Sequence, residues 1–210
     1  MLFHKYKLIF IGIPKNASHT PFNVLKNKTD QAHDHASFET TYLEHDKELL
    51  DTYTSFAITR NPYARAYSCW NFLRVLEHVE DRYKVKNFAE YLYALRDHSG
   101  YYKEQDEFLH DHELTFPQYT FITKDDYILV DKLFRLENLN EDWEQFITEY
   151  NKTSQIKIQS SKDEDNLQVT NHIDYEQPDW TKVYTPELYA IVNEYYKKDF
   201  KLFDYKIIKK

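Results

Sequence analysis

The fold is decided near the start of the chain, by residues 8–21, which read Leu-Ile-Phe-Ile-Gly-Ile-Pro-Lys-Asn-Ala-Ser-His-Thr-Pro. The first six residues form a continuous apolar run that Pro14 ends, a pattern typical of a strand buried on both faces of a parallel sheet. Apolar spacing resumes at Phe22 and predicts a helix. Buried strands that alternate with helices predict an α/β fold: a three-layer, P-loop-like domain with a central, mostly parallel sheet flanked by helices.

The loop between this strand and this helix, residues 14–20, has the composition of an anion site. Backbone N–H groups at a helix start lack intrahelical partners and the helix dipole is positive there, so such a loop attracts phosphate or sulfate. Lys15 adds a charge, and Ser18 and Thr20 add hydroxyl donors. The same residues also suit an ordinary strand-to-helix turn with an exposed lysine. The glycines and the Lys-Ser/Thr order of a nucleoside-triphosphate loop are absent, which disfavours a nucleoside triphosphatase.

A second buried strand is predicted at residues 54–59, followed by Arg-Asn-Pro and a helical pattern. Arg60 falls at the carboxyl end of this strand, where open α/β sheets bind their ligands. Ser68 lies about two helical turns into the next element. Together the guanidinium and the hydroxyl suit a second phosphate, although an arginine in this place is more often a salt-bridged strand-end residue. Two anion sites, one after each buried strand, suit a doubly phosphorylated nucleotide.

The bulk composition bounds the class of protein. A length of 210 residues predicts one domain over residues 1–210. The single cysteine excludes an internal disulfide framework and a cysteine-based zinc cluster. A formal charge of −8 argues against a nucleic-acid surface. No apolar run approaches the roughly 20 residues of a membrane span, and the first residues lack a signal-peptide pattern. We therefore expect a soluble, cytoplasmic protein without a nucleic-acid or membrane partner.

The rest of the chain predicts further helices and one more strand region. Leu43, Leu49 and Leu50 are expected on one face of a helix at residues 42–53. Asn140 and Thr185 are expected as N-caps, with Pro186 at a first helical position. Two short apolar runs are expected to form either one hairpin or a strand that follows a turn, and a polar stretch to form a surface loop. Two further helices are expected at residues 63–79 and 87–96. The two apolar runs are residues 127–130 and 132–135, and the surface loop is residues 154–166.

Five segments, in order along the chain, resemble those of the sulfotransferases that use 3′-phosphoadenosine 5′-phosphosulfate (PAPS). The likeness is greatest to the carbohydrate and heparan-type branch and its short bacterial or viral relatives. Residues 14–20 resemble the family's Pro-Lys-small-small-Ser/Thr loop, and residues 60–68 resemble its Arg-Asn/Asp-Pro-x-x-Arg-x-x-Ser segment. Residues 112–121 contain its Pro-Gln, residues 134–142 its Arg-x-Glu-x-Leu-x-x-Asp, and residues 184–205 its terminal helix and closing Phe-x-Tyr. Any one segment is weak evidence, whereas five in sequence are specific.

The resemblance implies how the donor is bound. The loop would hold the 5′-phosphosulfate, and Lys15 would neutralise charge on the leaving phosphate. Arg60 and Ser68 would hold the 3′-phosphate. The implied donor-binding set is Lys15, Asn16, Ala17, Ser18, His19, Thr20, Arg60 and Ser68. This chain departs from many members at Ala17 and Ser18, which replace paired glycines, and at His19, which replaces a Thr or Ser.

The resemblance also implies a catalytic base. Residues 33–38 read His-Asp-His-Ala-Ser-Phe and resemble the segment that carries the base in the heparan 2-O-sulfating branch. His35 is then the base and His33 the second candidate, with Glu39 and His19 in reserve. The histidine pair is also open to weaker interpretations, as metal ligands or as solvated loop residues. No metal site is predicted, because in-line positioning and charge stabilisation supply what sulfuryl transfer needs.

The acceptor implied by the resemblance is a hydroxyl, most naturally that of a carbohydrate, while a tyrosine or a small alcohol remains open. The oligomeric state is not predicted. Two other classes stay open at this point. A kinase-like nucleotide enzyme shares the strand–loop–helix start, and a non-catalytic relative would keep the fold without the reaction.

Overall fold

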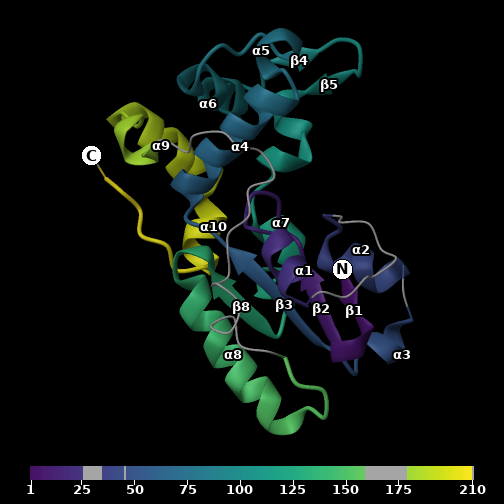
Figure 1. Cartoon of the computed structure of the whole chain (residues 1–210). Coiled ribbons are helices and arrows are strands. Elements are labelled where there is room, and N and C mark those ends of the chain that lie inside the picture. The colour runs from purple at the N-terminus through teal and green to yellow at the C-terminus, as the bar shows by residue number, and fades with distance from the viewer. Residues whose placement is uncertain (26–34, 45, 159–178, 210) are drawn as a thin grey trace. The chain divides into compact units, whose positions relative to one another are not determined.

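The computed structural model describes residues 1–25, 35–44, 46–158 and 179–209 (Figure 1). The chain divides into two compact units. The first comprises Met1–Arg60 and Thr120–Asp174, and the second comprises Asn61–Tyr119 and Tyr175–Lys210. The first unit carries a four-stranded sheet and the second is mainly helical. The single domain expected over residues 1–210 stays a prediction.

The sheet of the first unit has the order β1 (Leu2–Phe3), β2 (Leu8–Ile11), β3 (Thr54–Thr59) and β8 (Lys132–Arg135). The pairs β2–β3 and β3–β8 are parallel, whereas β1 pairs antiparallel with β2, so the sheet is mixed. The predicted α/β class and both predicted buried strands are confirmed. Because β2 and β3 run parallel, their carboxyl ends lie at the same edge of the sheet.

The core of the first unit follows from side chains that alternate along the strands. Phe10 of β2 stacks on Phe56 of β3, with ring centroids 4.9 Å apart. Helix α8 (Leu139–Thr153) packs Trp143 and Phe146 on the same face. Leu25, the last residue of α1 (His19–Leu25), joins this cluster. One face of the sheet is therefore covered by α1 and α8.

Two expectations in this unit, a helix at residues 42–53 and a cap at Asn140, are corrected by local hydrogen bonding. The helix expected at residues 42–53 is two short helices, α2 (Phe38–Glu44) and α3 (Lys47–Leu50). They separate because Ser37 Oγ accepts from the Thr40 N–H while Asp46 Oδ1 accepts from the Glu48 N–H, which starts each helix anew. Leu43 is consequently 86 % exposed while Leu50 is buried, so the two share no buried face. The side chain of Leu49 lies outside the described part.

Asn140 is not a cap. The chain enters α8 through a 3₁₀ turn at Leu136–Asn138, so Asn140 lies inside the helix, and Asp142 instead accepts the Arg135 N–H at 3.0 Å. Of the two alternatives for the apolar runs, the structure supports a strand that follows a turn rather than one hairpin. β7 (Tyr127–Ile128) pairs with β6 (Thr123–Lys124), and β8 joins the main sheet. A short helix, α7 (Tyr119–Ile122), precedes this hairpin. Of the surface loop expected at residues 154–166, residues 159–166 lie outside the described part.

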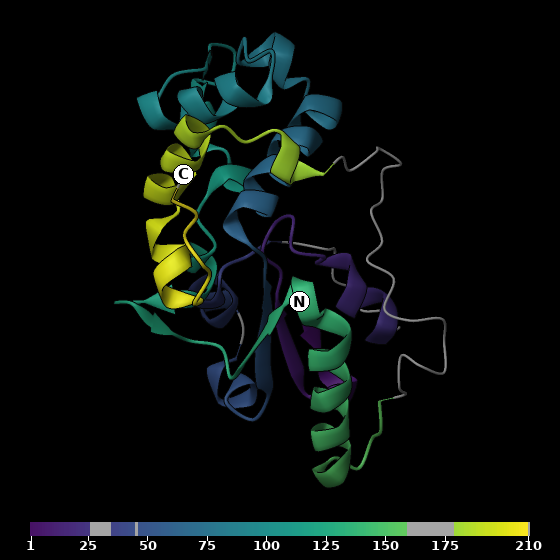
Figure 2. The ribbon, with the colours of Figure 1, turned by 90° about the vertical axis from the view of Figure 1, so that its left-hand side faces the viewer.

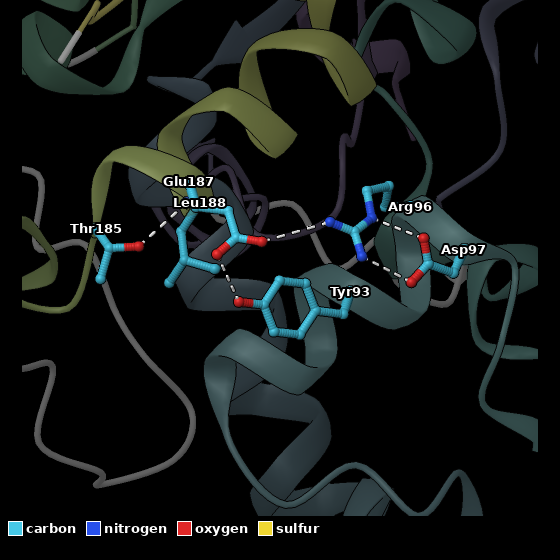
Figure 3. Close-up of polar contacts among 6 residues, drawn as sticks. All are labelled: Tyr93, Arg96, Asp97, Thr185, Glu187 and Leu188. Atoms are coloured by element: carbon cyan, nitrogen blue, oxygen red, sulfur yellow. Dashed lines mark hydrogen bonds and ion pairs between the residues drawn. The ribbon is translucent and has the colours of Figure 1, made fainter.

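The second unit is built on three helices that contact one another: α4 (Pro62–Leu76), α6 (Phe88–Asp97) and α9 (Pro186–Tyr195) (Figure 2). The Thr185 cap is confirmed, since its Oγ1 accepts the Leu188 N–H at 3.3 Å. Figure 3 shows how α6 and α9 also meet at the surface, where Tyr93 donates to Glu187 and Arg96 pairs with it. Such exposed pairs add little stability, so the buried apolar cluster holds the helices together. The remaining elements are α5 (Val79–Arg82), β4 (Tyr101–Tyr102), β5 (Glu107–Phe108) and α10 (Lys197–Leu202).

Candidate active site

In the loop that follows β2, the backbone alternates between left-handed and other conformations from one residue to the next. Lys15 has φ of 66° and Ala17 has φ of 57°, both in the left-handed region, whereas Asn16 and Ser18 do not. Alternation of this kind turns successive N–H groups toward one side and forms a concave nest that binds anions. The predicted anion loop therefore has a backbone pattern that also occurs in loops that bind phosphate or sulfate.

This conformation is costly for residues with a Cβ. Left-handed backbone costs an L-residue about 1–2 kcal/mol, which is the reason glycine is preferred in such loops. Strained backbone of this type persists only where surrounding contacts hold it, and it clusters at functional sites. Within the loop the Asn16 N–H bonds the Ile13 carbonyl at 3.2 Å, and the Thr20 N–H bonds the Ala17 carbonyl at 2.9 Å.

Two side chains tie the loop to the end of β3. Asn16 is 1 % exposed, and its Nδ2 donates to the carbonyl of Ile58 at 2.8 Å. Arg60, half-buried directly after β3, donates through Nη1 to the carbonyl of Lys15 at 3.0 Å. The predicted loop and the predicted strand-end arginine are therefore brought together, although the sequence patterns alone do not predict this contact.

His35 also lies at this edge of the sheet. Its Nδ1 is 2.6 Å from the carbonyl oxygen of Gly12, directly after β2. A carbonyl oxygen can only accept a hydrogen bond, so Nδ1 carries the proton, and in the neutral ring the lone pair belongs to Nε2. Ser37 starts α2 immediately afterwards and fixes the direction of the chain here. A base that accepts a proton at Nε2 requires this tautomer, in which Nδ1 carries the proton.

The other predicted residues fall in different places. Lys15 and His19 are half-buried, while Ser18 and Thr20 are buried. His33 lies outside the described residues. Glu39 is exposed and pairs with Lys124 at 2.6 Å, which makes it a surface carboxylate.

Ser68 belongs to the second unit, where it lies on α4. Its side chain is 3 % exposed, and its Oγ has no hydrogen-bond partner among the described residues. A buried hydroxyl normally finds a partner, so this oxygen suits a polar group supplied by a ligand.

A buried polar network in the second unit is absent from the sequence expectations. Arg65 donates to the carbonyls of Phe116 at 2.8 Å and Leu114 at 3.4 Å. The carboxylate of Asp199 accepts the N–H groups of Gln118 and Tyr119, both at 2.9 Å. Burial raises the pKa of Asp199 to about 6, against the opposing effects of Arg65 and of these hydrogen bonds. The sequence could have indicated this network in one way: Arg65, Gln118 and Asp199 belong to three of the five segments that resemble the family.

Within the described ranges, no three His, Cys, Asp or Glu side chains are grouped so that they could hold a metal ion. In that same part of the chain, no helix combines the length and apolar character needed to cross a membrane.

Comparison with known proteins identifies a protein family but no individual relative. Neither the curated proteins nor the solved structures include a significant match to this chain. A model of the sulfotransferase family matches residues 1–206, which is nearly the whole chain. The resemblance inferred from the five segments is thereby confirmed, and the chain belongs to the sulfotransferase family.

Proposed function

We propose that the protein transfers the sulfuryl group of PAPS to an acceptor hydroxyl, with the loop of residues 14–20 holding the 5′-phosphosulfate. The observation that carries this proposal is the alternating backbone at Lys15 and Ala17 in the loop after β2, a pattern typical of anion-binding nests. Sulfotransferases of this family generally take PAPS as donor, and the family match covers the same loop. The P-loop-like character of the fold is part of this proposal.

Arg60 and Ser68 are the proposed partners of the 3′-phosphate. Arg60 follows β3 at the edge of the sheet where the loop lies, and it already contacts the loop through the Lys15 carbonyl. An arginine fork binds phosphate oxygens in pairs. Ser68, whose buried Oγ has no partner among the described residues, is added as a partner on the strength of the family resemblance alone.

In the proposed reaction, His35 Nε2 takes the proton of the acceptor hydroxyl while the acceptor oxygen attacks sulfur in line. The new S–O bond forms as the bond from sulfur to the 5′-phosphate oxygen breaks, and the electron pair leaves with that oxygen. The Lys15 ammonium neutralises the charge that develops there. The products are the sulfate ester of the acceptor, adenosine 3′,5′-bisphosphate and a proton on His35 that passes to water. His33 remains the second candidate for the base.

A carbohydrate hydroxyl is the proposed acceptor, on the strength of the resemblance to the carbohydrate and heparan-type branch. The absence of a nucleic-acid partner, which is expected from the formal charge of −8, stays a prediction. The cytoplasmic location stays a prediction.

The test is sulfuryl transfer from sulfur-labelled PAPS to a panel of sugars, a tyrosine peptide and small alcohols. His35→Ala should lower turnover by roughly 10²–10⁴-fold, as loss of a general base does, and should leave affinity for adenosine 3′,5′-bisphosphate within about twofold. His4→Ala, which changes an exposed histidine of the same unit, is the matched control and should leave turnover unchanged.

Near-normal turnover of His35→Ala would contradict the assignment of the base. Transfer of phosphate from ATP, with none of sulfate from PAPS, would instead identify a kinase. Failure of the wild-type chain to bind the bisphosphate at all would favour a non-catalytic relative.

A further inference from the structure

The loop and the end of β3 are joined by two hydrogen bonds that run in opposite directions. A loop side chain, Asn16, donates to a strand carbonyl, that of Ile58, at 2.8 Å. The residue after the strand, Arg60, donates to a loop carbonyl, that of Lys15, at 3.0 Å. We call these two bonds the clasp.

Both hydrogen bonds of the clasp act on a single peptide unit. The carbonyl held by Arg60 belongs to Lys15, and the side chain bonded to β3 belongs to the next residue, Asn16, so both bonds fix the Lys15–Asn16 peptide. This peptide follows the left-handed φ of Lys15 and precedes that of Ala17. The clasp therefore holds the part of the nest where the backbone is strained.

Resting on the proposed function, we propose that Asn16 is a positioning residue and that the clasp lets Arg60 couple the two anion sites of the donor. A guanidinium carries five N–H donors in one plane and can bind a carbonyl and a phosphate together. A 3′-phosphate that orders Arg60 also orders the bond from Arg60 to the Lys15 carbonyl. The loop that holds the 5′-phosphosulfate is then tightened by a group on a different carbon of the ribose, the 3′-phosphate.

This coupling has a consequence for catalysis. Binding energy from a remote part of a substrate raises turnover when it positions the reacting group. Adenosine 5′-phosphosulfate, which lacks the 3′-phosphate, should therefore lose turnover as well as affinity. If Arg60 served only as an anchor for the 3′-phosphate, the loss would be in affinity alone.

The experiment measures how much affinity the 3′-phosphate adds, in the wild-type chain and in two variants. Adenosine 5′-monophosphate and adenosine 3′,5′-bisphosphate are titrated into each protein by calorimetry. Asn16→Ala breaks one half of the clasp and leaves the Arg60 side chain in place. Arg60→Lys keeps a cation for the phosphate and loses the planar fork. Asn71→Ala, which removes a buried asparagine side chain from α4 of the second unit, is the control.

The measured factor is the ratio of the affinity for adenosine 3′,5′-bisphosphate to the affinity for adenosine 5′-monophosphate. This factor should be the same in the wild type and in the Asn71→Ala control. In Asn16→Ala and Arg60→Lys that factor should fall by at least about fivefold, the lower range of coupling between sites. Asn16→Ala is the sharper variant, because a purely local role for Asn16 would weaken both ligands equally and leave the factor unchanged. If Asn16→Ala does not fold, turnover of the wild type at saturating adenosine 5′-phosphosulfate decides the same question. The coupling predicts lower turnover than with PAPS, whereas a simple anchor predicts weaker affinity and equal turnover, which would overturn the coupling.

An unchanged factor in the variant that folds would overturn the coupling while leaving the proposed function intact. Absence of bisphosphate binding by the wild type would overturn the proposed function and the coupling with it.

Discussion

Arg60 and Arg65 belong to one segment of the sequence, yet their surroundings differ. Arg60 is half-buried at the end of β3 and reaches the anion loop of the first unit. Arg65 is 1 % exposed on α4 and donates to two backbone carbonyls of the second unit. A spaced motif can therefore contain residues of two kinds, some available to a ligand and some that stabilise the fold. Burial and hydrogen-bond partners tell them apart.

The largest expected effect separates the two arginines by stability. Arg65→Ala should lower the free energy of unfolding by about 3–5 kcal/mol, the cost of removing one partner from a buried charged network. It leaves the Asp199 carboxylate without its buried cation and two carbonyls without their donors. Arg60→Ala should change the same quantity by less than about 1 kcal/mol. Denaturant unfolding measures both, and equal losses would contradict the comparison.

The next effect concerns Asp199, the acidic member of the same network. Asp199→Asn should cost about 1–3 kcal/mol, because the backbone N–H groups of Gln118 and Tyr119 bond different oxygens of the carboxylate and the amide keeps only one acceptor oxygen. Burial raises the pKa of Asp199 to about 6 from its ordinary value of 3.8. The folded state thus binds this proton more tightly than the unfolded state, so the contribution is present at low pH and is lost as pH rises through about 6.

Unfolding of the wild type and of Asp199→Asn from about pH 4 to about pH 7 tests this sign. The wild type should lose stability relative to the variant as pH rises through this window. Parallel profiles would mean that Asp199 titrates in the folded chain as it does in the unfolded chain.

A smaller effect is expected where the segment after α10 meets the start of α4. The Tyr63 hydroxyl accepts the Ile208 N–H at 2.8 Å and donates to Asn193 Oδ1, while Asn193 Nδ2 donates to the Ile208 carbonyl at 3.0 Å. Ile208→Pro removes the N–H donor and should cost about 1 kcal/mol more than Ile208→Val, which keeps it. Thermal unfolding measures the difference, and equal midpoints would show that this triad contributes nothing.

The smallest effect lies in the anion loop. Ala17→Gly removes the Cβ from a left-handed position and should raise the free energy of unfolding by up to about 1 kcal/mol. Ser18→Gly is the matched control, because Ser18 is not left-handed, and glycine there should destabilise by about 0.5–1 kcal/mol. If Ala17→Gly destabilised as much as Ser18→Gly, the strain at Ala17 would be refuted.

What could be predicted from the sequence depended on how local the signal was. β2 and β3 are continuous apolar runs, and Thr185 with Pro186 is a complete helix start, so all three were predictable. β1 and the β6–β7 hairpin have strands of two residues, too short to show a period. The break between α2 and α3 was missed because the side chain of Asp46 starts a second helix inside one apolar pattern.

For the candidate site, position was predictable and geometry was not. Residues 14–20 were expected to form an anion loop, but Lys15 and Ala17 carry no sign that their backbone is left-handed, since glycine usually marks such places. The bond from Asn16 to Ile58 and that from His35 to Gly12 join residues 42 and 23 positions apart. The network of Arg65, Gln118 and Asp199 is equally long-range, and the pairing emerges only when the strands and helices are assembled.

The central claim is that the loop after β2 and Arg60 bind the two phosphate-like groups of PAPS. Calorimetric titration of the wild type and of Arg60→Ala with adenosine 3′,5′-bisphosphate tests it most directly. We predict binding at one site in the wild type, and affinity at least about tenfold weaker in Arg60→Ala, as loss of a charged hydrogen bond implies, with the unfolding midpoint lowered by no more than about 4 °C. Equal affinity in the two proteins, or no binding to the wild type, would contradict the claim.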